Sequence, residues 1–516
     1  PSTAVPQLLE THLWSALTLD SRMRVFAFTL LMGGMVGIIS RCGGMRGLVD
    51  AITPVASNRR RGQLTTWALG LVVFFDDYAN TMLLGSTLRP LSDRLRISRA
   101  KLAYLVDSTS APVAGLALVS TWVAGEISYV QDGLNNARAG GSNIDAEAFD
   151  LFISSIPYGF YVLWALLLVP LVAILGRDFH PMWRAERDAL EGNDQSRSKH
   201  FSVDEPETQA SHWLFAFIPV VVTVGSIVAL MWWTGRTSIL QKDSGATPSL
   251  MEIFGDADPY GSLLWGSLVG MLVAFALSIM CRLLTVKLTI DAACRGAAQM
   301  LPALLILWLA SSLSSMTGGD PTPADKRARE VAVQVAAAQG IEANPLADFA
   351  YKEYRLYTGD YLSASIGDSL PTWLLPTLIF ALSAGVAFAT GTSWGTIGIV
   401  MPMAVPLAYS MLAGESNSVA IDNPLLLCTI ASVLAGAIFG DHCSPISDTT
   451  VLSSQASGCD HIAHVWTQLP YAMVVGVFAI LFGTLPVGLG VSVWWLLPIG
   501  VVAMVMALLL LGRRVD

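Results

Sequence analysis

Polar and charged residues interrupt a strongly apolar segment in the last quarter of the chain. Residues 425–439 are apolar, and Gly440 and Pro445 then favour the end of a helix. The interruption carries two carboxylates, an imidazole and several hydroxyls: Asp441, His442, Ser444, Ser447, Asp448, Thr449 and Thr450. Ionisable groups at membrane depth cost about 2.5–3.5 kcal/mol each, and by default they mark ion or proton pathways. Carboxylates and hydroxyls beside freed backbone carbonyls predict an oxygen-rich site for a hard cation.

Antiport needs a site that holds either the cation or the proton and never both. A poorly hydrated carboxylate meets this need, because burial disfavours its charged form and a bound cation favours that form again. We expect Asp441 and Asp448 to be the main competing carboxylates. His442 relays protons in this scheme, although a structural role fits it equally well. Further ligands of the transported cation are expected from several stretches: Asp76, Asp77, Asn80, Asp107, Thr390, Thr392, Ser393, Ser444, Ser447 and Thr449.

Each acid also has a structural interpretation, as a helix cap or as one partner of an ion pair. We favour that interpretation for Asp460, which comes just before a helix-like run. Asp107 fits a hydrogen-bonding role between helices as well as a ligand role. Adjacent side chains point in different directions, so Asp76 and Asp77 cannot easily both face one site, and we favour Asp77.

The composition predicts an all-α polytopic membrane protein. The 516 residues are 53% hydrophobic and only 13% charged, whereas soluble domains average about 25% charged. Several apolar runs reach the length needed to cross a bilayer core of about 30 Å, and about ten to thirteen membrane segments are expected. The expected partners are membrane lipid and a small cation, and we allow for a homodimer. A net charge of −9 without a basic stripe gives no sign of nucleic acid.

Basic residues suggest how the first segments are oriented. Residues 41–62 and 89–101 are both rich in Arg, which predicts that both lie on the cytoplasmic side. The segment between them, 63–88, therefore reads as a re-entrant hairpin with Asp76 and Asp77 near its tip, unless one basic loop breaks the rule. Residues 102–123 form a second segment with a polar interruption, and the acidic stretch 124–150 is expected to be a loop on the outer face.

The chain divides into two membrane halves around a polar insert. We expect an N-terminal half over 1–311, which contains a first inverted repeat over about 24–175. The insert covers 318–370, and the C-terminal half over 371–516 contains the second repeat. The best likeness between halves pairs Asn80–Tyr104 with Asp448–Tyr471. Only the first of these is basic, as two copies of opposite topology would show.

Three long blocks resemble the NhaC-type sodium/proton antiporter family, a branch of the ion transporter superfamily. They are FFDDYANTMLLGSTLRPLSDRLRISRAKLAYLVDSTSAPVA (74–114), ATGTSWGTIGIVMP (389–402) and FGDHCSPISDTTVLSSQASGCDHIAHVWTQLPYA (439–472). The resemblance implies a secondary transporter of the bacterial inner membrane that exchanges Na⁺ or Li⁺ for H⁺ by alternating access. The chain departs from the family in its insert and in lacking an apolar N-terminal segment. Because it begins at Pro1, we expect a missing N-terminal piece.

Two rival classes remain to be separated. Some members of the family resemble exchangers of organic acids or amino acids, whose carboxylates need cationic or backbone N–H groups. The chain has no Lys or Arg between Arg355 and Arg513, but the amides of 391–395 would serve. A membrane metalloenzyme would need metal ligands, and the spacing of the candidates matches no standard zinc pattern. The candidates are Cys443, Cys459, His461 and His464. We therefore expect a transporter without a catalytic site or a resident cofactor.

Overall fold

The computed structural model is built almost entirely from helices in the parts of the chain that it describes. The predicted insert 318–370 falls outside those parts except for Leu370. The structure describes residues 13–18, 20–74, 76–117, 120–139, 144, 146–192, 212–242, 253, 257–301, 304, 305, 308, 309, 312, 370–413 and 419–515.

Eight helices within these ranges are long and apolar enough to cross a membrane, or nine if a bent pair counts as one more. The bent pair joins α10 (Ala148–Ser155) and η3 (Ile156–Tyr158) to α11 (Phe160–Leu175) at 48°. The prediction of an all-α polytopic membrane protein is confirmed. The eight are α3 (Asp20–Arg41), α13 (Leu214–Lys242), α15 (Pro259–Met280), α21 (Leu375–Thr390, entered through η5, Thr372–Leu374), α22 (Ser393–Leu412), α23 (Pro424–Cys443), α25 (His461–Phe478, continued by η7, Ala479–Thr484, and α26, Leu485–Gly488) and α27 (Val493–Leu511).

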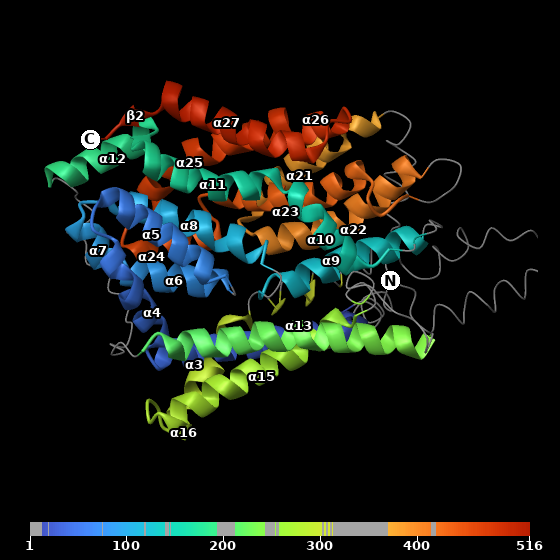
Figure 1. The fold of residues 1–516 in the computed structure, drawn as a ribbon. Helices are drawn as coiled ribbons and strands as arrows, with labels where there is room; N and C mark the ends of the chain where they lie inside the picture. Colours follow the sequence, from blue (N-terminus) through green and yellow to red (C-terminus); the bar gives the residue numbers. More distant parts are fainter. Residues whose placement is uncertain are drawn as a thin grey trace, which may run out of the picture.

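Helices α3, α13, α15 and α16 (Val286–Gln299) form a layer of their own below the rest of the molecule (Figure 1). Glycines allow its closest approach: Gly33 and Gly37 of α3 lie against the backbone of Gly296 in α16. Such contacts between small residues are typical of helix packing in membranes. Two short elements, α2 (Ser15–Thr18) and α4 (Gly44–Ile52), flank α3, and η2 (Thr53–Val55) leads on to the site-bearing part.

Helices α5 (Arg59–Val72) and α6 (Asp77–Thr87) form a helical hairpin where the sequence predicted one, and its re-entrant course in the membrane stays a prediction. The Arg59 guanidinium donates a hydrogen bond to the Arg96 carbonyl at 2.8 Å, so the start of α5 lies near the chain that leaves α6. At the tip, the Asn80 amide nitrogen donates to the carbonyls of Gly70 (2.9 Å) and Val73 (3.0 Å). These bonds hold the two arms together and place the acid pair at the turn.

A broken helix follows, with halves α8 (Arg99–Ala114) and α9 (Val123–Ala139). The prediction of an outer loop over 124–150 is wrong, because α9 is a buried helix packed against α22. Its polar residues misled the hydropathy argument, since several of them, such as Glu126 and Asp132, are buried against protein. Asn136, for example, donates to the Pro402 carbonyl at 2.9 Å.

Helices α21 and α22 form a second hairpin. Gly391 ends α21 in the left-handed region (φ +69°), and Thr392 caps α22 by accepting from the Gly395 amide at 3.5 Å. Helix α23 runs parallel to α21, because Gly436 lies against the Phe380 carbonyl and Gly440 against that of Ala384. Since α22 leads back to the start of α23, the chain reverses at the polar break that the sequence indicated.

The second broken helix consists of α23 and α24 (Asp448–Ser457). Its break begins at Ser444, so the prediction that Gly440 ends the helix is wrong. Gly440 stays helical, and its missing side chain makes room for the backbone of α21. Asp441 and His442 consequently lie in the last turn of α23, while Asp448 starts α24.

One arm of each hairpin packs against the broken helix that follows the other hairpin. Hairpin arm α6 packs on α24, and arm α22 packs on α9. The Arg89 guanidinium donates to the carbonyls of Ala456 (2.6 Å) and Gln455 (2.7 Å), and Arg99 at the start of α8 donates to Ser457 at 3.0 Å. The end of α24 therefore meets the start of α8, and the two broken helices run in opposite directions.

Residues 59–139 and residues 375–457 thus form two units. Each unit contains a hairpin followed by a broken helix, and the broken helices of the two units run in opposite directions. The predicted pairing of Asn80–Tyr104 with Asp448–Tyr471 matches α6 with α24. The order of elements does not follow it, because a hairpin followed by a broken helix in each unit matches α6 with α22 and α9 with α24.

The basic stretch 89–101 is mostly helical, in α7 (Arg89–Arg94) and the first turn of α8. Lys101 is fully buried and forms an ion pair with Asp178. Asp178 lies in β1 (Arg177–Asp178), which pairs with β2 (Arg513–Arg514) beside the amphipathic helix α12 (His180–Glu191). The basic residues of this stretch therefore form structural contacts near the first hairpin, in addition to suggesting its orientation.

Candidate functional site

Asp441 lies in the last turn of α23. Its side chain is buried, and its Oδ2 accepts hydrogen bonds from Ser393 Oγ at 3.0 Å and Thr449 Oγ1 at 3.4 Å. The donors come from the first turns of α22 and α24, so three elements meet at this carboxylate. Its Oδ1 has no hydrogen-bond partner among the described residues.

Asp448 lies at the start of α24 and links the second unit to the first hairpin. Its Oδ2 accepts from the Tyr78 hydroxyl at 2.5 Å, and its Oδ1 accepts from the Thr449 backbone amide at 2.8 Å. Thr449 therefore contacts both Asp441, through its hydroxyl, and Asp448, through its amide. The two predicted carboxylates are brought together by one residue between them.

The acid pair at the first hairpin tip is also buried. Asp76 Oδ2 accepts from Thr121 Oγ1 at 3.0 Å, which ties the tip to the break of the first broken helix. Asp77 starts α6 and lies within electrostatic reach of Asp448. The two neighbours thus have different surroundings, and the choice of Asp77 over Asp76 as a ligand of the cation stays a prediction. Asn80 fastens the tip through its amide nitrogen and leaves its Oδ1 without a partner in the described structure.

Three helix N-termini converge on these carboxylates. Helix α6 begins at Asp77, α22 begins beside Asp441 at Ser393, and α24 begins at Asp448. The N-terminal end of a helix carries a partial positive charge and unpaired N–H groups, which favour a nearby carboxylate. This arrangement helps to keep several acids buried in one region.

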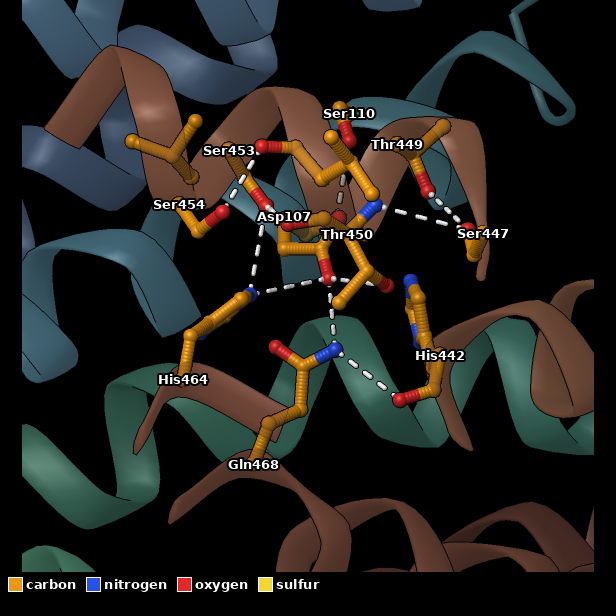
Figure 2. A network of polar contacts seen from close by, with 12 residues as sticks. Asp107, Ser110, His442, Ser447, Thr449, Thr450, Ser453, Ser454, His464 and Gln468 are labelled. Atoms are coloured by element: carbon orange, nitrogen blue, oxygen red, sulfur yellow. Dashed lines mark hydrogen bonds and ion pairs between the residues drawn. The ribbon is translucent and has the colours of Figure 1, made fainter. Parts of the chain in front are cut away.

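Asp107 lies in a network of polar contacts (Figure 2) that continues through Thr450, Ser447 and Thr449 to Asp441. Its Oδ2 accepts from Gln468 Nε2 at 2.5 Å and from Thr450 Oγ1 at 3.4 Å, and it lies 3.4 Å from His464 Nε2. Gln468 also donates to the His442 carbonyl at 3.1 Å. The structure thus places Asp107 among amide, hydroxyl and imidazole groups, on the side of α24 that faces α25.

The remaining predicted residues have mixed placements. Ser447 caps α24 and contacts Thr449 at 3.1 Å, and Thr392 caps α22, so both shape the site from its edge. Ser444 donates to the Phe388 carbonyl at 2.8 Å, a bond that joins the break to α21. Thr390 is exposed and donates to the Val386 carbonyl at 2.8 Å, so the structure does not bring it to the carboxylates.

His442 points away from Asp441. Its Nδ1 lies 2.9 Å from the Tyr161 hydroxyl, and its Nε2 has no partner in the described part of the chain. The ring borders a small cavity next to the Asp107 network. His442 therefore sits between that network and α11.

Sequence reasoning missed several residues of the site. Tyr78 and Thr121 bind the predicted acids, and Gln468 binds Asp107 across a long sequence distance. Glu126, one turn into α9, is a buried acid whose Oε2 has no partner among the described residues. Two of these residues could have been found from the sequence. Tyr78 directly follows the acid pair, and Glu126 lies just after the break between α8 and α9.

The carboxylates do not form a compact cluster. Among the described residues, no group of three His, Cys, Asp or Glu side chains is arranged to hold a metal ion. Asp441 and Asp448 are instead interleaved with hydroxyls of Ser393 and Thr449. Such a mixed set of oxygens suits a transported monovalent ion or a proton more than a tightly held divalent one.

The fold and the site define a multi-pass membrane transporter with paired hairpins and broken helices. A family model described as the Na⁺/H⁺ antiporter family matches residues 113–319 and 355–487, and the chain belongs to that family. The prediction of a cation/proton antiporter is confirmed at this level.

Individual relatives are similar to this chain over different lengths. An uncharacterized protein of Haemophilus influenzae is 30% identical over 457 residues, which cover 89% of this chain and 77% of that protein. The malate-2H⁺/Na⁺-lactate antiporter of Bacillus subtilis is 43% identical over 98 residues, or 19% of this chain and 18% of that protein. The YdaH transporter of Alcanivorax borkumensis has a similar fold, with a TM-score of 0.57, 13% identity and coverage of 94% of this chain and 89% of that chain.

Proposed function

We propose that this antiporter exchanges Na⁺ or Li⁺ for H⁺ across the bacterial inner membrane, and that Asp441 and Asp448 hold the two ions in turn. The observation that carries the proposal is the bridge through Thr449, which contacts both carboxylates between two helix breaks. Ser393 completes the oxygen set at Asp441. No resident cofactor is needed, because the exchanged ions themselves supply the driving force.

Competition follows from the burial of these acids. An uncompensated pair of buried carboxylates is costly, so one of the two must be neutralised by a proton or by a cation. A cation that enters between Asp441 and Asp448 removes the need for that proton and releases it. Loss of the cation restores the need, which couples the two fluxes at one site.

Alternating access follows from the paired architecture. The site lies where the tips of hairpins α5–α6 and α21–α22 meet two helix breaks, and each hairpin enters from the opposite side to the other. Inverted repeats of this kind expose a central site to each side of the membrane in turn. The direct bond from Tyr78 in one hairpin to Asp448 in the other unit is a contact that such a movement changes.

A proteoliposome assay tests this function. Vesicles with an acidic lumen and an internal pH dye receive Na⁺, Li⁺ or K⁺, each as the chloride salt. Alkalinisation of the lumen by Na⁺ or Li⁺, and a much weaker response of Asp448→Asn at the same cation concentration, supports the proposal. If none of the three cations changes the luminal pH, the proposal is contradicted.

A second function is exchange of a small organic acid or amino acid coupled to Na⁺ or H⁺. The observation that favours it is the convergence of three helix N-termini, which offer N–H donors to a carboxylate. A relative whose printed name includes malate and lactate points the same way. In the assay above, a response that requires an added organic acid or amino acid supports this second function.

A further inference from the structure

The end of the chain lies against helix α12 at one end of the molecule (Figure 1). Strand β2 pairs with β1, so that Arg513 stands opposite Asp178 in the two-stranded sheet. The Arg177 guanidinium donates to the carbonyls of Leu509 at 2.9 Å and Gly512 at 2.8 Å. These contacts fix the end of α27 and the cationic residues that follow it beside the first turns of α12.

Trp183 of α12 gathers cationic groups from both parts of the chain. Its indole Nε1 donates to the Arg514 carbonyl at 2.8 Å. The guanidinium carbons of Arg187 and Arg513 lie over the indole, at 5.1 Å and 5.4 Å from its ring centroid, and the His180 ring stacks on it at 5.9 Å. Attraction between a cation and an aromatic face holds guanidinium groups in such places. The indole therefore assembles a cationic surface that neither segment would form alone.

The cations of this surface act on one another. Partial desolvation and the positive charges of Arg184 and Arg513 lower the pKa of His180 below its ordinary value. Both guanidinium groups are thus close enough to the same imidazole to disfavour a further positive charge there. Arg184 and Arg513 are exposed, and an anion bound between them would relieve their repulsion.

Nearby acids do not neutralise these two arginines. On the exposed face of α12, Glu191 pairs with Arg187 at 3.1 Å. Asp188 forms no ion pair with Arg184, and no carboxylate of the described residues pairs with Arg513. The two guanidinium groups therefore keep their donors available to a ligand from outside the chain.

This surface lies directly beyond an apolar face of the membrane-length helix α27. Leu510 and Leu511 at its end are 75% and 65% exposed, and Ile174 at the end of the neighbouring helix α11 is 49% exposed. Exposed apolar side chains at the end of a span face lipid tails, and basic residues that follow lie at the level of the headgroups. One phospholipid can therefore meet the leucines with its acyl chains and the arginines with its phosphate.

The side of the membrane also fits a negatively charged lipid. The Arg96 guanidinium donates to the Leu190 carbonyl of α12 at 3.3 Å, so α12 lies beside the basic stretch 89–101. That stretch is expected on the cytoplasmic side, where anionic lipids give the leaflet a negative surface potential.

We propose that Arg184, Arg513 and Trp183 form a binding site for the headgroup of an anionic phospholipid, phosphatidylglycerol in the test below. The phosphate accepts hydrogen bonds from the two guanidinium groups, whose planar donors suit phosphate oxygens. The indole holds Arg513 in place from the protein side. This inference goes beyond the proposed exchange of ions and does not depend on which substrate is exchanged.

The bound lipid stabilises a part of the fold that supports the first hairpin. On the buried side of α12, Glu186 accepts from Arg59 at the start of α5 at 2.5 Å and from the Ser98 amide at 2.7 Å. In β1, Asp178 pairs with Lys101 and accepts from the Tyr471 hydroxyl. A ligand that binds only the folded arrangement of α12 and β2 raises the stability of these contacts by mass action.

The test measures binding of phosphatidylglycerol to the full chain in detergent by native mass spectrometry. It compares Arg184→Gln/Arg513→Gln with Arg60→Gln/Arg94→Gln, a control that removes the same charge from exposed arginines elsewhere in the basic stretches. Each basic residue near an anionic lipid contributes about fivefold in affinity, so the site variant should bind about twenty-fivefold more weakly. The control and Arg184→Lys/Arg513→Lys should stay close to wild type, and phosphatidylcholine should bind none of these proteins at the site.

Thermal unfolding gives a second measurement that is independent of transport. Phosphatidylglycerol should raise the Tm of the wild type and of the control variant, and should leave the Tm of Arg184→Gln/Arg513→Gln unchanged. If that double variant does not fold, the single change Arg184→Gln on the exposed face of α12 replaces it, with an expected loss of about fivefold in affinity.

Three results would overturn the inference. The first is wild-type affinity for phosphatidylglycerol in the glutamine variants, and the second is an equal loss in Arg60→Gln/Arg94→Gln, which would mean that only the total charge matters. The third is displacement of phosphatidylglycerol by an equal concentration of inorganic phosphate. That result would make the surface a site for a free anion and not for a lipid.

Discussion

The interface between α6 and α24 and the interface between α22 and α9 occupy equivalent places in the two units, yet different side chains fill them. In the first, Tyr78 donates to Asp448, and the start of α24 presents hydroxyls to two more carboxylates. In the second, the Trp394 ring packs at 5.6 Å from Trp122 and 6.4 Å from Tyr129. A repeated architecture therefore supplies two breaks, but most of the polar chemistry is concentrated at one.

The difference suggests that one interface mainly stabilises the fold and that the other mainly takes part in transport. Aromatic contacts and close glycine approaches, such as Gly125 against Trp394, make the α22–α9 interface a packed support. The α6–α24 interface is held by hydrogen bonds to charged groups, which can be exchanged for bonds to an ion or to water. Variants at equivalent places should therefore affect transport at one interface and stability at the other.

The largest effect on transport is expected from Asp441→Asn and Asp448→Asn. Removing a charged partner costs about 1.5–3 kcal/mol, so the apparent Na⁺ affinity should fall by about tenfold to a hundredfold. The measurement is the Na⁺ concentration that gives half-maximal luminal alkalinisation in proteoliposomes. Asp460→Asn is the control, and wild-type affinity in both site variants would contradict the assignment.

Arg89→Ala is expected to weaken the fold by a similar free energy. The guanidinium binds two carbonyls at the end of α24, and each such bond to a charged group contributes about 1.5–3 kcal/mol. Thermal unfolding of the detergent-purified protein should show a clear drop in Tm. Arg94→Ala, a change at an exposed residue of the same short helix, should leave Tm unchanged. Equal Tm values for both variants would mean that Arg89 does not fasten the two units.

Ser393→Ala and Tyr78→Phe should have smaller effects on transport. Each removes one hydroxyl from a carboxylate, and a single hydrogen bond contributes about 0.5–1.5 kcal/mol, or about twofold to tenfold in affinity. The same proteoliposome titration measures both. An effect as large as that of Asp448→Asn would show that these hydroxyls do more than hold a carboxylate in place.

Glu126→Gln should have the smallest effect of the series. Glu126 is buried beside the aromatic interface, and no donor to its side chain is found in the described structure. Apparent Na⁺ affinity should stay within about a factor of two, well short of the tenfold that 1.4 kcal/mol represents. A loss comparable to that of Asp441→Asn would place a second cation site in the other unit and abolish the asymmetry.

The sequence predicted the helical membrane fold and the main polar breaks because apolar runs and helix breakers act locally. Basic residues at both ends of 63–88 were enough to predict the first hairpin. Helix α9 was missed because hydropathy cannot tell Glu126 and Asn136 facing protein from the same residues facing water. The partners of the acids were harder still, since Gln468 reaches Asp107 only after α25 has packed against α8. Thr390 was drawn into the predicted site by its neighbours, and helix geometry turned it outward.

The central claim is that a cation and a proton compete for the same carboxylates, and the pH dependence of Na⁺ affinity tests it most directly. Initial rates of exchange are measured in wild-type proteoliposomes over a range of Na⁺ concentrations at several acidic pH values. Under competition, the KM for Na⁺ rises by about tenfold for each unit that the pH falls, by mass action, while the maximal rate stays constant. A constant KM with a falling maximal rate would contradict the claim, because protons would then act at a place other than the cation site.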